Sequence, residues 1–140
     1  MKDIYNLKRF INAQEITYYT ALKEIKNGKK KGHWMWFVFP QIDGLGLSAN
    51  SREYSIKNKE EANHYLNHEI LGKRLIEITS ILINLEDTSV KYIFGNPDYL
   101  KLKSSMTLFK IISTNNNIFS DTLNKYFNGE VCEYTKNKLS

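Results

Sequence analysis

The sequence predicts an all-α fold, a compact single-domain array of about six or seven helices. Apolar side chains recur at the 3.6-residue period of a helix along most of the 140 residues, whereas the two-residue period of a strand is not found outside one aromatic segment. No internal repeat and no linker rich in proline or serine divides the chain, and its length is that of one ordinary domain. We therefore expect one helical domain over residues 1–134 and a polar, frayed tail over residues 135–140.

The first predicted helix begins after Asp3, whose carboxylate can cap a first helical turn. Its buried stripe follows helical spacing and consists of Phe10, Gln14, Tyr18, Leu22 and Ile25. Gly28 ends this stripe, because glycine is common just past the last turn of a helix.

The middle of the chain contains two further helical patterns and one short turn. Asn58 and Glu61 resemble a capping box that opens a helix over residues 59–66. Apolar residues keep the helical period from about residue 69 to residue 85, and residues 90–94 form one further turn.

The last third of the chain predicts two more helices. Asn96 and Pro97 signal a helix start, with asparagine as the cap and proline in the first helical position, and this helix runs to about Ser113. Residues 115–117 then form a loop, and residues 119–127 form the final helix.

An aromatic run from His33 to Gln41 contains both tryptophans of the chain, Trp34 and Trp36. Its large side chains must be buried, since each is worth roughly 1.5–3 kcal/mol of hydrophobic free energy. This run and residues 42–47 are the candidates for a strand. On a helix or a strand, His33 and Gln41 fall on one face. Either the two side chains line a pocket, or His33 satisfies a core hydrogen bond and Gln41 caps a turn.

A glycine loop follows, and its residues 44–49 formally match the G-x-G-x-x-A dinucleotide fingerprint. That fingerprint requires the glycines to follow a strand directly and to open a helix within a βαβ unit. Residues 40–43 intervene here and no second strand follows, so a Rossmann site is not expected.

The same loop allows two other interpretations. The backbone N–H groups at Gly44 and Gly46 could approach a ligand closely, beside the hydroxyls of Ser48 and Ser51. Alternatively, the loop forms a tight turn in which Ser48 caps a short helix that extends through Tyr54.

A second polar motif lies on the helix expected over residues 97–113. Asp98, Lys101 and Ser105 follow one another at helical spacing along one face. Ser104, Ser105 and Thr107 place three hydroxyls within four residues. These hydroxyls either bond to carbonyls one turn earlier, or they bind a phosphate or ribose together with Lys101. In the second case Asp98 holds Lys101 in place or serves as an acid or base.

The charge balance is moderately basic, with 20 Lys and Arg against 15 Asp and Glu and a net charge of +5. Part of the excess is the run Lys29–Lys31, which is either a solvated loop or an electrostatic funnel for an anionic small molecule or a nucleic acid backbone. The single cysteine, Cys132, has no metal-ligand spacing around it. No motif predicts a metal or a cofactor.

No apolar stretch reaches the ~20 residues that a membrane-spanning helix needs. Residues 1–6 lack the charged and then apolar pattern of a secretion signal. We therefore expect a cytoplasmic protein without a membrane partner.

The two polar motifs together resemble the bacterial and fungal family known as domain of unknown function 1810. The segments that carry the resemblance are HWMWFVFPQ at 33–41, GLG at 44–46 and KLKSSMTLF at 101–109. The similarity runs from about Leu7 to Phe127 and implies a compact, mainly helical single domain without an established activity. Glu69 stands where the family usually has proline, and both residues are favourable in the first turn of a helix.

Several polar residues match the family pattern and have no evident packing role. They are Gln14, Tyr18, His33, Gln41, Ser48, Ser51, Tyr54, Asp98, Lys101, Ser104, Ser105 and Thr107. We expect the functional site among them.

The first candidate function is recognition of a nucleotide-like or phosphorylated small molecule by an enzyme such as a hydrolase of an ADP-ribose-type compound. Trp34 or Trp36 would stack on a base or shape the pocket, and His33 or Asp98 would supply acid–base chemistry. Lys101 with Ser105 would hold phosphate. The alternatives are a non-catalytic module that binds or sequesters such a ligand, and a nucleic-acid-binding protein. Both pocket hypotheses require the aromatic run and the helix of Lys101 to meet in the fold.

Overall fold

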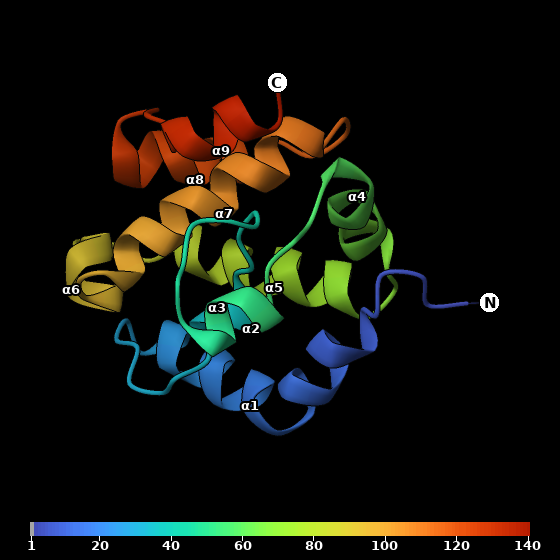
Figure 1. The fold of residues 1–140 in the computed structure, drawn as a ribbon. Helices are drawn as coiled ribbons and strands as arrows, with labels where there is room; N and C mark the ends of the chain where they lie inside the picture. The colour runs from blue at the N-terminus through green and yellow to red at the C-terminus, as the bar shows by residue number, and fades with distance from the viewer. Residues whose placement is uncertain (1) are drawn as a thin grey trace.

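Amphipathic segments at helical spacing build the five long helices of the fold (Figure 1). The computed structural model describes residues 2–140. The long helices are α1 (Lys8–Lys26), α4 (Lys59–Asn67), α5 (Leu71–Ile83), α7 (Asp98–Ile112) and α8 (Ile118–Phe127). Four short helices connect or follow them: α2 (Met35–Val38), α3 (Ala49–Glu53), α6 (Val90–Phe94) and α9 (Glu133–Lys138).

The all-α class is confirmed, but the expected number of helices was too low. Residues 2–140 contain nine helices, and their one β-bridge joins Ile42 to Ile56. The aromatic run does not form a strand. Its centre is the single turn α2, where the N–H groups of Val38 and Phe39 bond to Trp34 O and Met35 O. No neighbouring strand is present in this part of the chain to pair with it, so local helical bonds satisfy its backbone.

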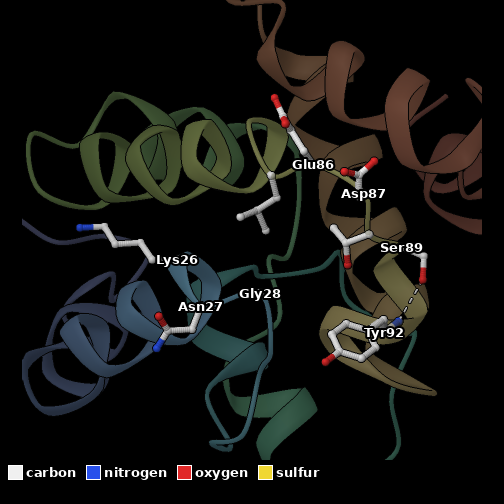
Figure 2. Close-up of a pocket in the computed structure, with 9 residues that line it drawn as sticks. Lys26, Asn27, Gly28, Glu86, Asp87, Ser89 and Tyr92 are labelled. Carbon is white, nitrogen blue, oxygen red and sulfur yellow. Dashed lines mark hydrogen bonds between the residues drawn. The ribbon is translucent and has the colours of Figure 1, made fainter.

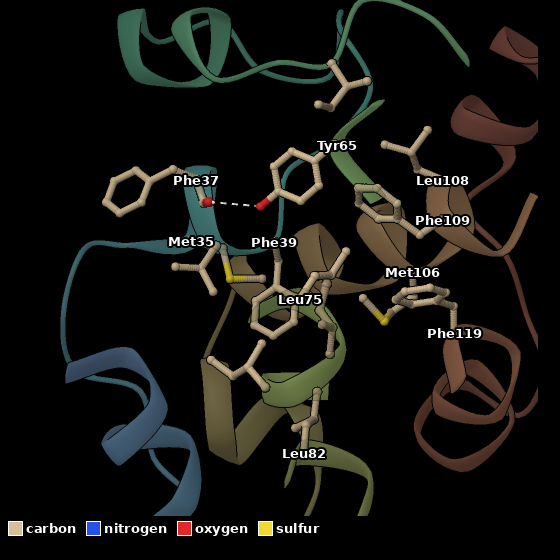
Figure 3. Close-up of a cluster of buried hydrophobic side chains, with 14 of the residues drawn as sticks. Met35, Phe37, Phe39, Tyr65, Leu75, Leu82, Met106, Leu108, Phe109 and Phe119 are labelled. Carbon is tan, nitrogen blue, oxygen red and sulfur yellow. Dashed lines mark hydrogen bonds between the residues drawn. The ribbon is translucent and has the colours of Figure 1, made fainter. Parts of the chain in front are cut away.

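The helices pack in three tiers that Figure 1 displays from blue to red. α1 lies on one side, α5 lies between, and α7, α8 and α9 form the opposite side. α5 contacts α1, α4 and α8, while α7 contacts α4, α6, α8 and α9. The core between these tiers is strongly aromatic (Figure 3), with Phe39, Tyr65, Phe109 and Phe119 all fully buried. Such rings contribute large apolar areas to the core.

Two predicted caps are confirmed and one helix start is shifted. The carboxylate of Asp3 accepts hydrogen bonds from the N–H groups of Leu7 and Lys8 at 2.7 and 2.9 Å. Asn58 Oδ1 accepts from Glu61 N at 2.9 Å, which opens α4. α7 begins at Asp98, with Pro97 in the cap position, so Asn96 is not the cap that the sequence suggested.

The C-terminal segment is not a frayed tail. Residues 133–138 form α9, and both Thr135 and Leu139 are buried. Ser104 Oγ lies 3.0 Å from Thr135 Oγ1, and Cys132 N donates to Thr107 Oγ1 at 2.9 Å. Hydrogen bonds to Ser104 and Thr107, rather than a repeated apolar stripe, attach this segment to α7. The sequence of the segment is therefore polar, which suggested disorder.

Candidate functional site

A pocket of about 770 Å³ lies between the glycine loop, α7 and the C-terminal segment. The aromatic run and α7 meet at this pocket, as both pocket hypotheses require. Its lining residues are Trp36, Gln41, Leu45, Gly46, Leu47, Ser48, Ser51, Pro97, Leu100, Lys101, Lys103, Ser104, Val131, Cys132 and Glu133. The volume lies within the range of about 300–1,000 Å³ that is typical of small-molecule sites.

α7 and its cap residue Pro97 supply one wall, because four of their residues share a face. Pro97, Leu100, Lys101 and Ser104 follow the i, i+3, i+4, i+7 spacing of one helical stripe and all line the pocket. Leu100 is half exposed, at 48%. An apolar side chain on an open wall of a cavity is available to a ligand rather than to the core.

Trp36 and Lys101 lie against each other in the pocket. Lys101 Nζ is 4.9 Å from the centre of the Trp36 ring, which is a cation–π distance. Lys101 Nζ is also 3.1 Å from Asp98 Oδ1, and Asp98 Oδ2 is 2.8 Å from Lys30 Nζ. Asp98 therefore joins the loop that follows α1 to the pocket wall.

Asp98 is ionised at neutral pH. Partial burial alone raises the pKa of this carboxyl, but the hydrogen bonds and charges of Lys30 and Lys101 outweigh burial and hold the pKa below its ordinary value. A carboxylate in this state cannot donate a proton, so Asp98 does not suit the role of general acid.

The glycine loop folds against Ser51 and against α9. Ser48 Oγ accepts from Ser51 N at 3.1 Å and caps α3, as one of the two sequence interpretations expected. Gly44 has a φ of +103°, and a side chain there would collide with the hydroxyl oxygen of Tyr134. Tyr134 in turn donates from its hydroxyl to Asp43 O at 3.3 Å. Loop and C-terminal segment thus shape the pocket together.

Three of the predicted site residues are core residues whose polar atoms already have partners. Gln14 Nε2 donates to Phe37 O at 2.7 Å and to the Tyr65 hydroxyl at 3.1 Å. Tyr18 donates to Glu77, and its pKa is raised by burial and by that carboxylate. Trp34 is 1% exposed and donates to Glu24. None of the three lines the pocket.

Six further candidates also lie outside the pocket lining, and one of them, Asp98, contacts the lining through Lys101. His33 is exposed on the loop before α2, and Tyr54 packs on the rings of Phe10 and Phe37. Thr107 binds α9, as described above, and Ser105 is buried with no hydrogen-bond partner in the described chain. Gly44 lies against Tyr134 instead. The structure therefore brings together Trp36, Gln41, Gly46, Ser48, Ser51, Lys101 and Ser104.

The C-terminal wall of the pocket is the part that sequence reasoning missed. Val131, Cys132 and Glu133 line the pocket from the segment that leads into α9. The helical stripe of α7 could have indicated Leu100, because it lies next to Lys101 on the same face. No local pattern indicates residues 131–133, since their position depends on how α9 docks.

A second hollow of about 830 Å³ lies between the end of α1 and residues 85–92 (Figure 2). Charges of both signs line it, from Lys26 on one side and from Glu86 and Asp87 on the other. It contains no predicted site residue. Its size is similar to that of the first pocket, so side-chain chemistry and not volume favours the first.

Two kinds of feature are absent from residues 2–140. No cluster of three or more His, Cys, Asp or Glu side chains there could hold a metal ion. No helix in that range is both long enough and apolar enough to cross a bilayer.

Comparisons with known proteins agree with the resemblance of the two motifs. The family model for the protein of unknown function DUF1810 matches residues 4–139. The conserved hypothetical protein Rv1873 from Mycobacterium tuberculosis has a similar crystal structure, with a TM-score of 0.96, 45% identity and coverage of 98% of each chain. A comparison with curated proteins found no match. Because the family model spans nearly the whole chain, the protein belongs to the DUF1810 family.

Proposed function

We propose that the pocket binds a small molecule that combines a planar ring system with an anionic group, as nucleoside phosphates do. The observation that carries this proposal is that Lys101 Nζ lies 4.9 Å from the Trp36 ring inside one cavity. An aromatic ring beside a cation, in a pocket with apolar walls, suits a ligand with a π-face and a negative charge.

The two ends of such a ligand would find different partners. Leu45, Leu100 and Val131 offer apolar surface to the ring system. Lys101 offers charge, and Asp98 occupies one of the three N–H donors of its ammonium group. The remaining donors of Lys101 are available to phosphate oxygens, which favour charge-assisted hydrogen bonds, whereas the Ser51 hydroxyl already donates to Ser48 O at 2.9 Å.

Cys132 allows a direct test, because it is the single cysteine of the chain and lines the pocket. The rate of its reaction with an aromatic disulfide is measured alone and with NAD, ADP-ribose, nucleoside mono- and diphosphates and cyclic nucleotides. A ligand in the pocket is expected to slow this reaction at least tenfold. It should also stabilise the fold by about 2.7 kcal/mol at 100 times its dissociation constant.

Two variants and one matched control link any such effect to the pocket. Trp36→Leu should weaken binding by about 1–3 kcal/mol through loss of stacking, and Lys101→Gln should weaken it by about 1.5–3 kcal/mol through loss of a charged hydrogen bond. Lys73→Gln, on the exposed face of α5, should change nothing. The proposal is wrong if no compound protects Cys132, or if protection is equal in all four proteins.

A hydrolase of an ADP-ribose-type compound is the second candidate, because the carboxylate of Glu133 also lines the pocket. Glycosidic hydrolysis needs an acid and a base. Neither His33 nor Asp98 is among the residues that line the pocket, and Asp98 is held ionised, so Glu133 is the lining carboxylate that such an enzyme would use. Turnover of ADP-ribose that is lost in Glu133→Gln would support hydrolysis. Binding of ADP-ribose without turnover would support a sequestering module.

Nucleic acid binding has less support. Lys30 is committed to Asp98 and to Gly32 O, and Lys29 Nζ donates to Tyr92 O at 3.1 Å. A surface that tracks a nucleic acid backbone needs free cations and exposed stacking rings. Binding to a random oligonucleotide that weakens steeply between low and moderate salt would favour this function over the pocket.

A further inference from the structure

One uncharged side chain of the pocket wall makes no hydrogen bond to any other group within residues 2–140. The amide and hydroxyl side chains that line the pocket are Gln41, Ser48, Ser51 and Ser104. The hydroxyl of Ser51 donates to Ser48 O at 2.9 Å, and Ser48 Oγ accepts from Ser51 N at 3.1 Å. Ser104 Oγ lies 3.0 Å from Thr135 Oγ1. The half-buried carboxamide of Gln41 therefore has an unpaired acceptor and two unpaired donors at the wall.

The backbone of Gln41 is fixed, although its side chain is free. The residues on either side, Pro40 and Ile42, are both buried. Gln41 O accepts from Ile56 N at 2.8 Å, beside the bridge that joins Ile42 to Ile56. A side chain on a fixed backbone loses less conformational freedom when it binds a ligand. The carboxamide is therefore placed to recognise the chemistry of a bound molecule.

Stacking alone does not select among flat rings. Trp36 lines the same pocket, and every nucleobase has a face that can lie against an indole. Lys101 binds the phosphate that all nucleotides share. Selection among ring systems requires a group that recognises the edge of the ring, and Gln41 has the unpaired donors and acceptor for this task.

We infer that Gln41 determines the specificity of the pocket for its ring system, by pairing with a ring edge on which a hydrogen-bond donor lies beside an acceptor. This inference rests on the proposed function and names the class of ring. A carboxamide offers a donor and an acceptor side by side, so it forms two hydrogen bonds with an edge of the complementary pattern. Adenine and cytosine have such an edge at the amino group and the neighbouring ring nitrogen.

The test compares pairs of nucleotides that differ by one amino group. AMP is paired with purine riboside 5′-monophosphate, and CMP is paired with zebularine 5′-monophosphate. The second member of each pair lacks the amino group of the first. The dissociation constant of each compound is obtained from the concentration at which it protects Cys132 from the aromatic disulfide. The ratio of the two constants within a pair reports the amino group, because changes in charge or packing affect both members alike.

Wild type should bind the amino compound of at least one pair about fivefold more tightly, or better, because the Gln41 oxygen has no donor to accept from in the other member. The pair that shows this preference distinguishes a purine ligand from a pyrimidine ligand. Gln41→Leu, of similar size, should bind both members about equally. Gln41→Glu keeps an acceptor and loses the donors, so it should keep a preference at least as large as that of wild type. Lys73→Gln is the control and should behave as wild type.

Two results would overturn the inference and leave the proposed function intact. The first is equal protection of wild type by both members of each pair, because a flat ring with a phosphate would still bind. The second is a Gln41→Leu protein that keeps the wild-type preference, because another group would then recognise the ring edge.

The remaining outcomes are also decisive. If none of the compounds protects Cys132 in any of the proteins, the inference fails together with the nucleotide form of the proposed function. Circular dichroism establishes that each variant is folded. If Gln41→Leu does not fold, Gln41→Glu decides the question, because loss of the preference in that variant would show that the acceptor at position 41 does not contact the amino group.

Discussion

At the scale of single residues, the buried charges of this protein are tied to backbone groups of several segments. All five N–H donors of Arg9 are used. They bond to the carbonyls of Tyr5, Asn6, Glu53 and Ser55 and to the Glu61 carboxylate, at 2.6–2.8 Å. A guanidinium in a fixed fork geometry can satisfy this many acceptors at once, and an ammonium cannot.

Arg9→Lys should therefore destabilise the fold by about 3 kcal/mol, although it keeps the charge. The cost arises because carbonyls and the 1% exposed Glu61 carboxylate lose their donors. Urea unfolding measures the loss. Arg52→Lys, at an exposed site on α3, should stay within about 0.5 kcal/mol of wild type. A loss below 1 kcal/mol for Arg9→Lys would contradict the argument.

Glu24 predicts a dependence of stability on pH. Its Oε1 accepts from Lys31 N, Gly32 N and Trp34 Nε1 at 2.7–2.9 Å. Burial alone raises the pKa of Glu24, but these hydrogen bonds outweigh it and lower the pKa from its ordinary value of 4.5. Because the pKa of Glu24 is lower in the folded protein than in the unfolded chain, the ionised side chain stabilises the fold above about pH 4.5. This stabilisation is lost as the pH falls through the pKa of the folded state.

Glu24→Gln should consequently be less stable than wild type by about 1 kcal/mol at neutral pH, since a neutral acceptor forms weaker hydrogen bonds. The difference between the two proteins should shrink between about pH 5 and pH 2. Thermal unfolding across this range measures it. If the difference in stability stays constant with pH, the shape of the side chain and not its charge explains the loss.

At the scale of the elements, the junction of α4 and α5 shows where helix propensity fails as a guide. Gly72 lies in the first turn of α5, and a Cβ there would overlap the carbonyl oxygen of Leu66 and lie 2.7 Å from its carbonyl carbon. Propensity alone predicts that alanine would stabilise this helix by about 1 kcal/mol. Because the α4 backbone lies so close, we expect alanine to destabilise the protein instead.

Gly72→Ala should destabilise the protein by roughly 3 kcal/mol, because two backbone segments would have to separate. Lys73→Ala is the matched control at the next, exposed position of the same turn, and should change stability by less than about 0.5 kcal/mol. Chemical unfolding of both variants distinguishes the two expectations. A more stable Gly72→Ala protein would show that α4 and α5 can move apart without cost.

The sequence predicts the long helices well and the short ones poorly, for a physical reason. α1, α5, α7 and α8 each repeat an apolar stripe over several turns, so their periods are visible. α2 and α9 contain one or two turns and are stabilised by tertiary contacts. The hydroxyls of Ser104 and Thr107, which suggested a ligand, attach the C-terminal segment to α7, and Ser104 also lines the pocket.

At the scale of the whole molecule, the candidate site depends on segments from three distant parts of the chain. The sequence could indicate Trp36 and Lys101 from their motifs, and the structure places both at one pocket. The sequence could not indicate the pocket wall at residues 131–133, because the position of that wall depends on the docking of α9. The buried end of the chain is therefore part of the architecture that forms the pocket.

Leu139→Ala tests this dependence. Leu139 is 7% exposed and belongs to the hydrophobic core, so its truncation should cost about 2–3 kcal/mol. A frayed tail would give a change below about 0.5 kcal/mol. Asn137→Ala, at an exposed site of α9, is the matched control.

Loosening of α9 should also accelerate alkylation of Cys132 by a neutral reagent, since Cys132 N is bound to Thr107 only while α9 is docked. Unchanged stability and unchanged Cys132 reactivity in Leu139→Ala would mean that the pocket does not depend on the C-terminal segment.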